Sequence, residues 1–148
     1  MSTLHLICGL PGSGKSTLAK KLESEHPALR LTPDEWMSRI LGDGHNEAKR
    51  TVVETIQWEI TEKALGLGID VILESGFWSK KERDDLRAKA KAIGANTKLY
   101  YLDVSRDELW NRIDRRNKNL PEHTFPIKES DLDEWITRFE PPNEEELR

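Results

Sequence analysis

One stretch, Gly9-Leu10-Pro11-Gly12-Ser13-Gly14-Lys15-Ser16-Thr17, constrains the fold of this chain more than any other. It fits the phosphate-binding loop pattern without a gap: a glycine, four residues, Gly-Lys, and then Ser or Thr. A short apolar run, residues 4–8, precedes the loop, and a helical pattern with Leu18, Ala19 and Leu22 follows it. This strand–loop–helix context is the one that such a loop requires. The sequence therefore predicts a nucleoside-triphosphate site near the start of the chain.

The residue types in this loop each suit a part of a bound nucleotide. Glycines let backbone N–H groups turn inward around the β-phosphate, and the N-terminus of the following helix favours an anion. Lys15 is expected to reach the β- and γ-phosphates, and the Ser16 hydroxyl to hold Mg²⁺. We expect the nucleotide to be bound by the whole loop: Gly9, Leu10, Pro11, Gly12, Ser13, Gly14, Lys15, Ser16 and Thr17.

Composition narrows the class further. The 148 residues suit a single domain, 1–148, and a net charge of −4 gives no overall basic field that would attract nucleic acid. Cys8 is the only cysteine, which excludes an internal disulfide and predicts a small buried side chain. The N-terminal apolar run is too short for a signal peptide or a membrane span. We expect a cytoplasmic protein with no membrane partner.

Apolar runs, capping residues and breakers predict alternating helices and strands. Strands are expected over residues 4–8, 28–31, 69–73 and 98–102. Helices are expected over residues 16–25, 33–41, 47–65, 79–94, from 105 onward, and 131–139. Such alternation predicts an α/β fold, with a parallel sheet covered by helices on both faces. Ligands then bind at the carboxyl ends of the strands, where the loop, Asp34, Glu74 and Asp103 all lie.

Several details of these helices are also predicted. In the 47–65 helix, an apolar residue recurs every four positions, which predicts a buried row of Ala48, Val52, Ile56, Ile60 and Ala64. Gly66 is expected just past the end of that helix, and Thr32 and Ser130 are expected to cap two others. Residues 117–128 are polar and contain prolines, so we expect them to be mobile.

Several classes of nucleotide-binding protein are excluded. No glycine has an aspartate three residues before it, as a Ras-like GTPase requires, and Asn117-Lys118-Asn119-Leu120 lacks the acid that reads guanine. The chain has no room for the second domain of a ring-forming AAA+ ATPase, and it carries no ABC-type signature. A small phosphotransferase remains.

Segments along nearly the whole chain resemble the P-loop kinases that include chloramphenicol phosphotransferase, the zeta toxins and the polynucleotide 5′-kinases. These segments are the loop itself, Thr32-x-Asp34-Glu35-Trp36, residues 71–77, Arg83, and Leu109-x-x-Arg112-x-x-Arg115-Arg116. The final Phe139-Glu140-Pro141-Pro142 is similar to AAA-type ATP-binding members of that group. The resemblance implies a three-layer P-loop NTPase fold, kinase-like, with a short lid at about residues 106–128. It also implies ATP and Mg²⁺ as cofactors.

The resemblance makes Asp34 the general base that accepts a proton from the acceptor hydroxyl. Phosphoryl transfer needs positioning and charge neutralisation, plus a carboxylate within reach of the attacking oxygen. An acid at the start of a helix is also explained by the helix dipole alone. Glu74 ends a strand beside the loop, where it either holds Mg²⁺ with Ser16, contacts the acceptor, or is simply solvated. Asp103 is a second candidate for the same role.

Arginines are the candidates for neutralising the negative charge of the phosphates. Arg112, Arg115 and Arg116 resemble the lid of these kinases, where one arginine neutralises the transferring phosphate and another stacks on adenine. We favour Arg112 and Arg116 equally as catalytic residues, with Lys15 and Asp34. Arg83 lies in the first turn of a helix, where a cation is unfavourable. Contact with the substrate explains it, and so does pairing with Glu82 or Asp84.

Two tryptophans are candidates for an acceptor pocket. Trp36 follows Asp34, and Trp78 follows the Glu74 loop, so both can offer flat apolar surface to a substrate ring. Trp36 fits the core equally well. The other three, Trp58, Trp110 and Trp135, are expected to pack between helices. The histidines show no ligand spacing.

Together these features predict an Mg²⁺/ATP-dependent phosphotransferase that moves the γ-phosphate to a hydroxyl of a small molecule. The expected substrate-binding residues are Asp34, Trp36, Glu74, Trp78 and Arg83. One alternative is a polynucleotide or RNA 5′-hydroxyl kinase, although Met37 stands where those kinases have an arginine that contacts the substrate phosphate. Another is an ATP-binding regulatory or toxin-related module with little transferase activity.

Overall fold

The computed structural model describes residues 1–42, 46–120 and 126–147. Helices and strands follow one another along these residues in the predicted order. The strands are β1 (Thr3–Cys8), β2 (Ala28–Leu31), β3 (Asp70–Gly76) and β4 (Asn96–Tyr101). The helices are α1 (Lys15–Glu25), α2 (Pro33–Leu41), α3 (Glu47–Gly66), α4 (Lys80–Ala92), α5 (Arg106–Lys118) and α6 (Glu129–Arg138). None of the described helices is long and apolar enough to cross a membrane.

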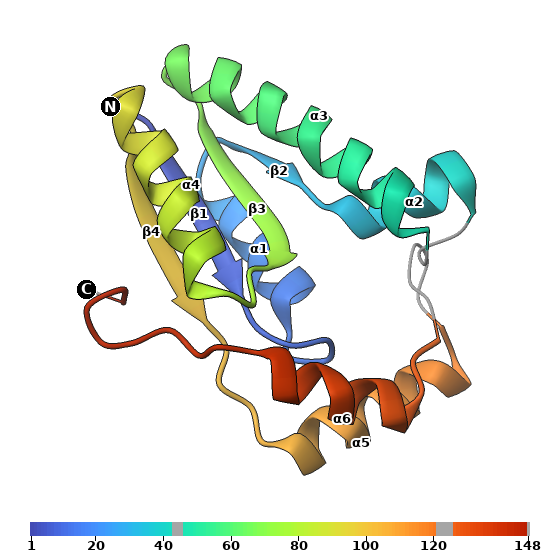
Figure 1. Ribbon diagram of the computed structural model, residues 1–148. Coiled ribbons are helices and arrows are strands. Elements are labelled where there is room, and N and C mark those ends of the chain that lie inside the picture. Colours follow the sequence, from blue (N-terminus) through green and yellow to red (C-terminus); the bar gives the residue numbers. More distant parts are fainter. Residues whose placement is uncertain (43–45, 121–125, 148) are drawn as a thin grey trace.

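The strands form one parallel sheet in the order β2-β3-β1-β4 (Figure 1). The central strand β1 pairs with β3 on one side, with Leu4 opposite Val71, and with β4 on the other, with Leu4 opposite Thr97. Parallel neighbours need crossover connections, and the helices between the strands supply them. All four strands therefore end at the same edge of the sheet, where the phosphate-binding loop follows β1.

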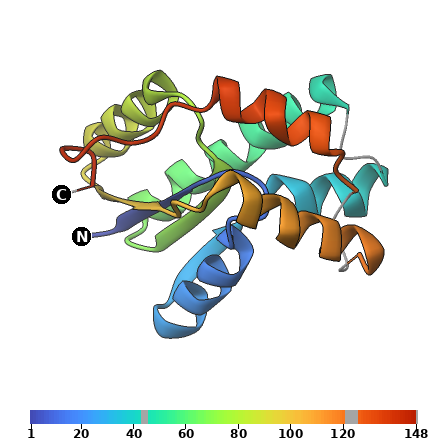
Figure 2. The ribbon, with the colours of Figure 1, turned by 90° about the horizontal axis from the view of Figure 1, so that it is seen from below.

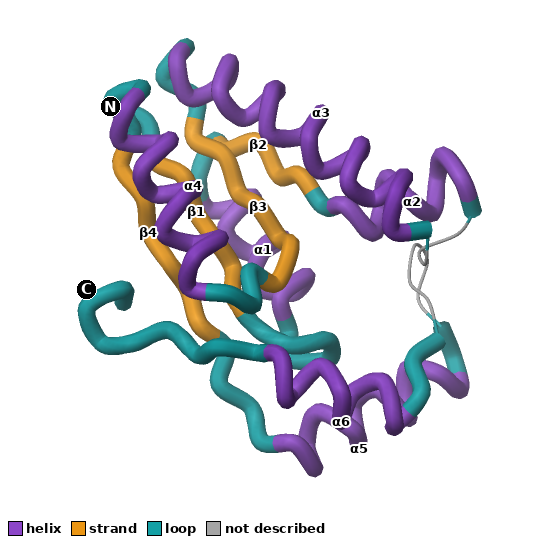
Figure 3. Tube along the Cα trace, viewed as in Figure 1, coloured by secondary structure: helices purple, strands orange, loops and turns teal. Residues whose placement is uncertain are grey.

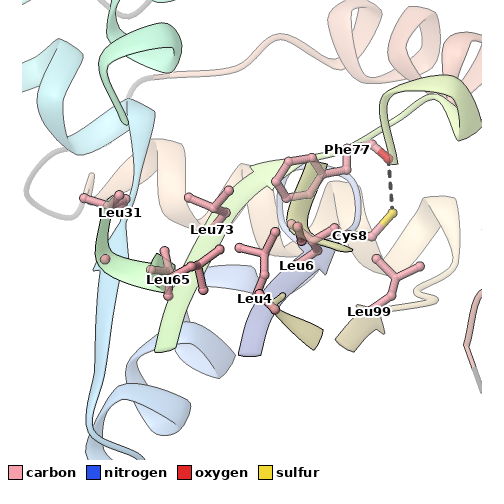
Figure 4. Close-up of a cluster of buried hydrophobic side chains, with 12 residues drawn as sticks. Leu4, Leu6, Cys8, Leu31, Leu65, Leu73, Phe77 and Leu99 are labelled. Carbon is pink, nitrogen blue, oxygen red and sulfur yellow. Dashed lines mark hydrogen bonds between the residues drawn. The ribbon is translucent and has the colours of Figure 1, made fainter. Parts of the chain in front are cut away.

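Helices cover both faces of this sheet, because successive side chains of a strand point to opposite faces. Leu4 and Leu6 of β1 pack with Leu73 on the face covered by α3 and α4 (Figure 4). On the opposite face, Ile7 and Ile72 pack against α1, which lies alone on that side in Figure 2. The predicted α/β architecture, with a parallel sheet and helices on both faces, is confirmed.

Helices α5 and α6 form a separate pair beyond the carboxyl ends of the strands (Figure 3). Leu109 and Ile113 of α5 pack on Leu132 of α6, and Leu10 of the phosphate-binding loop contacts this cluster. Asn117 joins the pair further, because its side chain donates to the Ile127 carbonyl at 2.6 Å and accepts from its N–H at 3.0 Å. Of the segment predicted to be mobile, residues 117–118 end α5, and residues 121–125 lie outside the described part of the chain.

The predicted buried row of α3 is confirmed only in part: Ala64 is buried and Ile60 packs on the core, but the rest of the row is exposed. Val52 and Ile56 are 53% and 42% exposed, whereas the buried residues are Val53, Gln57, Thr61, Ala64 and Leu65. The helix is turned by one residue relative to the expected face, and the row that meets the sheet includes two polar side chains. Of these two polar side chains, Thr61 finds a hydrogen-bond partner within the helix, because its hydroxyl donates to the Gln57 backbone carbonyl at 2.8 Å.

Three predicted helix ends also differ. Helix α3 includes Gly66, and Gly68 instead has the positive φ, of 82°. Lys128, not Ser130, precedes the first turn of α6 and makes no side-chain cap. Thr32 does precede α2, but its hydroxyl makes no cap hydrogen bond; it donates to Glu74, and its oxygen accepts from Arg30 Nη1. Ser79 and Ser105 cap α4 and α5 as expected.

Candidate active site

The phosphate-binding loop is a tight turn between β1 and α1. The Leu10 carbonyl accepts from the Ser13 N–H at 3.1 Å and from Lys15 Nζ at 3.0 Å. Gly14 has a φ of 99° and immediately precedes the first residue of α1. The unpaired N–H groups of the first turn of α1, with the positive end of the helix dipole, therefore face the loop.

Two polar groups in the loop fit a bound phosphate. Partial burial lowers the pKa of the Lys15 ammonium to about 8, although Glu74 and Asp34 oppose this change. The Ser13 hydroxyl is buried and has no partner among the described residues. A phosphate would stabilise the charged ammonium and would accept a hydrogen bond from such a hydroxyl. These residues fit a nucleotide phosphate.

The absence of a side chain at Gly12 lets the loop pack closely against α5. Gly12 has a φ of 85°, and a Cβ built on it would lie 2.9 Å from Ile113 Cγ1 and 3.1 Å from the Leu109 carbonyl oxygen. A side chain at this position would therefore push the loop away from α5 or displace Ile113. The phosphate-binding pattern leaves this position unspecified, so the need for a glycine here comes from the close approach of α5, which is a property of the fold.

We expect Gly12→Ala to weaken the binding of ADP by about tenfold or more, because overpacking of this kind costs about 1–3 kcal/mol. The matched control is Gly68→Ala, since Gly68 has a similar φ of 82° but open space around it. The control isolates the backbone strain from the collision. Calorimetric titration of both variants with ADP is the measurement, and equal affinities in both would contradict the expectation.

Glu74 joins the loop to β2 and β3. Its side chain accepts from the Ser16 hydroxyl at 2.5 Å and from the Thr32 hydroxyl at 3.1 Å. Glu74 is only 7% exposed, so it is not the solvated strand end considered above. A buried carboxylate beside a hydroxyl is an oxygen donor set of the kind that Mg²⁺ prefers, so Ser16 and Glu74 fit this ion. Asp103 is exposed at the end of β4 and accepts from the Tyr101 hydroxyl at 3.4 Å.

Asp34 lies in the first turn of α2, immediately after β2, and its carboxylate is exposed. It forms an ion pair with Arg50 of α3. Sequence reasoning missed Arg50. The sequence did contain a signal that Arg50 has a partner, because a cation in the first turn of a helix is disfavoured by the helix dipole.

The two favoured arginines of α5 differ in their surroundings. Arg112 Nη1 donates to the Gly12 and Ser13 carbonyls at 3.3 and 3.4 Å, and its Nε donates to Glu108 at 2.9 Å. Arg116 is half-buried, and its Nε has no partner among the described residues. Partial burial lowers the pKa of Arg116, whereas Asp34 raises it, which places Arg116 in the field of the Asp34 carboxylate. Arg115 is exposed and donates to the Asn111 carbonyl of its own helix.

Arg83 does not belong to this site. Its side chain is fully buried, and its Nε pairs with Glu146 at 2.9 Å while its Nη1 donates to the Phe77 carbonyl at 2.7 Å. Both predicted explanations for Arg83 are therefore wrong. The positive charge of Arg83, which is unfavourable in the first turn of α4, is compensated by the carboxylate of Glu146, 63 residues away. Cys8, which donates to the same Phe77 carbonyl, is buried as predicted, and burial raises the pKa of its thiol to about 11.

The two candidate pocket tryptophans lie apart. Trp36 packs partly on the core and also lines an open hollow of about 370 Å³ with Arg39 and Ile40. Trp78 packs its ring 5.9 Å from that of Trp135, and its carbonyl accepts from the Glu140 N–H at 2.7 Å. This contact joins the start of the C-terminal segment to the loop after β3.

The parallel sheet, the phosphate-binding loop at the end of β1, and the acids that follow β2 and β3 define a nucleotide-binding domain of the P-loop kinase type. Residues 4–142 match the AAA domain family AAA_33, and the chain belongs to that family. No curated protein matches the sequence.

Solved structures of several kinase-related proteins share this fold. The Pnkp1/Rnl/Hen1 RNA repair complex contains a chain that matches with a TM-score of 0.78 and 21% identity, over 93% of this chain and 43% of that one. Kti12 of Chaetomium thermophilum, solved with ADP-AlF3, matches with a TM-score of 0.69 and 19% identity. The match covers 95% of this chain and 81% of that one. A gluconokinase from Sinorhizobium meliloti 1021 matches with a TM-score of 0.64 and 17% identity. The match covers 99% of this chain and 78% of that one. The protein thus spans less than half of the first chain, and at such low identities the TM-scores show a common fold alone.

Proposed function

We propose that the protein is an Mg²⁺/ATP-dependent phosphotransferase that moves the γ-phosphate of ATP to a hydroxyl of a small molecule. The observation that supports this most directly is the arrangement of two acids around the loop. Glu74 is buried and bonded to Ser16, whereas Asp34 is exposed and held by Arg50. This difference supports a metal-binding role for Glu74 and a role towards the acceptor for Asp34.

The residues of the chain divide the work of the reaction. Asp34 takes the proton of the acceptor hydroxyl, whose oxygen forms a bond to the γ-phosphorus while the bond from that phosphorus to its bridging oxygen breaks. Lys15 and Arg116 neutralise charge on the phosphates, and Arg112 fixes the loop through the Gly12 and Ser13 carbonyls. Ser16 and Glu74 would hold Mg²⁺, which would supply positive charge to neutralise the phosphates.

Helices α5 and α6 serve in this proposal as the lid, extending the expected segment of residues 106–128 to include α6. They pack on the loop through Leu10 and Gly12. Because the arginines and the apolar contacts lie on the same helix, a small rotation of α5 would move the charges toward or away from the phosphates.

A second candidate function, 5′-hydroxyl polynucleotide kinase, is favoured by the likeness to the RNA repair complex and by the open hollow beside α2. Trp36 and Arg39 line that hollow, and an aromatic ring with a nearby cation suits a nucleobase and a phosphate. Against it, Met37 is fully buried, so the position that holds a substrate-binding arginine in those kinases faces the core here.

The test is transfer of γ-labelled phosphate from ATP into pooled metabolites, nucleosides, antibiotics and 5′-hydroxyl oligonucleotides. We expect label in a small molecule. Label in an oligonucleotide alone would establish the second candidate. Binding of Mg²⁺ and ATP with no transfer to any acceptor would contradict both and would favour an ATP-binding regulatory module.

A further inference from the structure

A small pocket, lined by both apolar and polar side chains, lies on the α3–α4 face of the sheet, at the carboxyl end of β3. Its volume is about 110 Å³, room for about three or four water molecules, so it suits one end of a small molecule and not a whole substrate. Gln57 and Trp58 of α3 line it, with Phe77 after β3. Figure 1 shows α3 and α4 side by side over the sheet, with the end of β3 between them.

Two buried hydrogen-bond donors, on residues that line this pocket, have no acceptor among the described residues. Gln57 is only 2% exposed, and neither its Nε2 nor the Nε1 of Trp58 has a partner among the described residues. A buried donor left unpaired costs about 1–3 kcal/mol, so the chain retains both groups at the expense of stability. An indole nitrogen only donates, so the missing partner of Trp58 must be an acceptor atom, such as a hydroxyl oxygen.

Two carboxylates, of Glu54 and Glu82, line the same pocket from α3 and α4. Both residues remain exposed, and neither carboxylate has an ion-pair partner within the described ranges. Loss of hydration raises the pKa of both groups, and the charge of Glu54 adds to the rise at Glu82, although Arg50 opposes the rise at Glu54 and Arg83 opposes the rise at Glu82. An ammonium group between them would relieve this repulsion, whereas an acidic ligand would increase it.

The pocket is connected to the proposed catalytic residues through one short step along α3. Glu54 is one helical turn from Arg50, which pairs with Asp34. A molecule seated in the pocket would therefore extend toward the edge of the sheet where Asp34 lies.

We propose that this pocket binds the non-reacting end of the phosphate acceptor, and that the acceptor is a small hydroxylated molecule with an amine and no acidic group. The inference rests on the proposed function. The amine lies between Glu54 and Glu82, and an adjacent oxygen accepts from Gln57 and Trp58. The reacting hydroxyl is at the opposite end of the molecule.

The test measures binding without nucleotide, by following the indole N–H signals of the protein in NMR titrations with 2-amino-1,3-propanediol, glucosamine and gluconate. The Trp58 signal is assigned by its loss in Trp58→Phe. We expect both amines to shift this signal and gluconate to leave it unchanged. No shift with either amine, or an equal shift with gluconate, would overturn the proposal.

Two variants separate a binding role from a packing role. In Trp58→Phe and Gln57→Leu, we expect affinity for the amines, followed by the signals that still shift, to fall about tenfold while the midpoint of thermal unfolding stays level or rises, because each variant removes an unpaired buried donor. A marked fall in the midpoint with unchanged affinity would show that these side chains serve packing alone. Trp110→Phe, in the α5–α6 cluster, is the matched control and should leave amine affinity unaltered.

These readouts are independent of catalysis. If amines bind at Trp58 but no acceptor receives phosphate, the pocket stands and the proposed function fails. If phosphate is transferred to an acceptor that leaves the Trp58 signal unmoved, the transferase stands and the pocket proposal fails.

Discussion

Asp34→Asn is expected to lower kcat for phosphate transfer by about 10²–10⁴-fold, the range for loss of a general base. The amide keeps the size of the side chain but accepts a proton poorly. The pair with Arg50 also loses its charge attraction. Nucleotide binding depends on the loop and on Lys15, so affinity for Mg²⁺/ATP should change little. Steady-state kinetics with the identified acceptor, together with calorimetric titration with ADP, measures both quantities.

The matched control for Asp34→Asn is Glu35→Gln, one residue further along α2. Glu35 is half-buried and pairs with Arg30 at 3.5 Å on the side of β2. Its replacement tests whether any loss of acid in this turn slows the reaction. Equal losses of kcat in both variants, or full activity in Asp34→Asn, would remove Asp34 from its proposed role.

Arg83→Met is expected to lower the free energy of unfolding by about 3–5 kcal/mol, because it leaves Glu146 as a buried charge without its main partner. The Glu146 side chain is only 4% exposed, and it also accepts from Arg87 at 2.9 Å and from the Asn143 N–H at 2.9 Å. Chemical denaturation followed by tryptophan fluorescence gives this energy. The control is Arg106→Met, since Arg106 pairs with Glu129 and Asp133 at the surface, where ion pairs contribute little. A loss in Arg83→Met no larger than in the control would contradict the prediction.

The same ion pair carries a pH dependence of known sign. Burial opposes ionisation of Glu146, but hydrogen bonds from Arg83, Asn143 and Arg87 outweigh it and lower the pKa of Glu146 from 4.5 to about 2. The resulting stabilisation is complete above about pH 4.5 and is lost as the pH falls through 2. The difference in unfolding free energy between the native chain and Glu146→Gln should therefore shrink over this interval. A difference that stays constant from pH 5 to pH 2 would show that Glu146 is not ionised in the folded chain.

Local sequence signals predicted the strands and helices well, because each is fixed by residues close together in the chain. The apolar run before Gly9 makes β1, and Ser79 and Ser105 each cap the helix that follows them. The buried row of α3 was not predictable in this way. Two neighbouring rows of that helix carry apolar residues, and only the packing against the sheet selects the row that contains Gln57.

The features of the candidate site were likewise predictable only where the signal is local in the sequence. The loop and the order of the acids are local and were read from the sequence, whereas the roles of Arg83 and Arg50 depend on distant partners. Arg83 meets Glu146, and Arg50 meets Asp34, 16 residues away. In both cases the unfavourable charge in a helix's first turn was visible in sequence, but the compensating carboxylate was not. The unpaired donors of Gln57 and Trp58 left no local sign at all.

The attachment of the C-terminal segment has a mechanical consequence for the α5–α6 pair. Helix α5 continues from β4, and the segment after α6 is fixed to the opposite side of the site by Glu140 on Trp78 and Glu146 on Arg83. In the proposed lid role, attachment at both ends would limit opening of this pair to a rotation of small amplitude about the line between its anchors. Cutting one anchor would allow the pair a much larger range of positions to search before each closure.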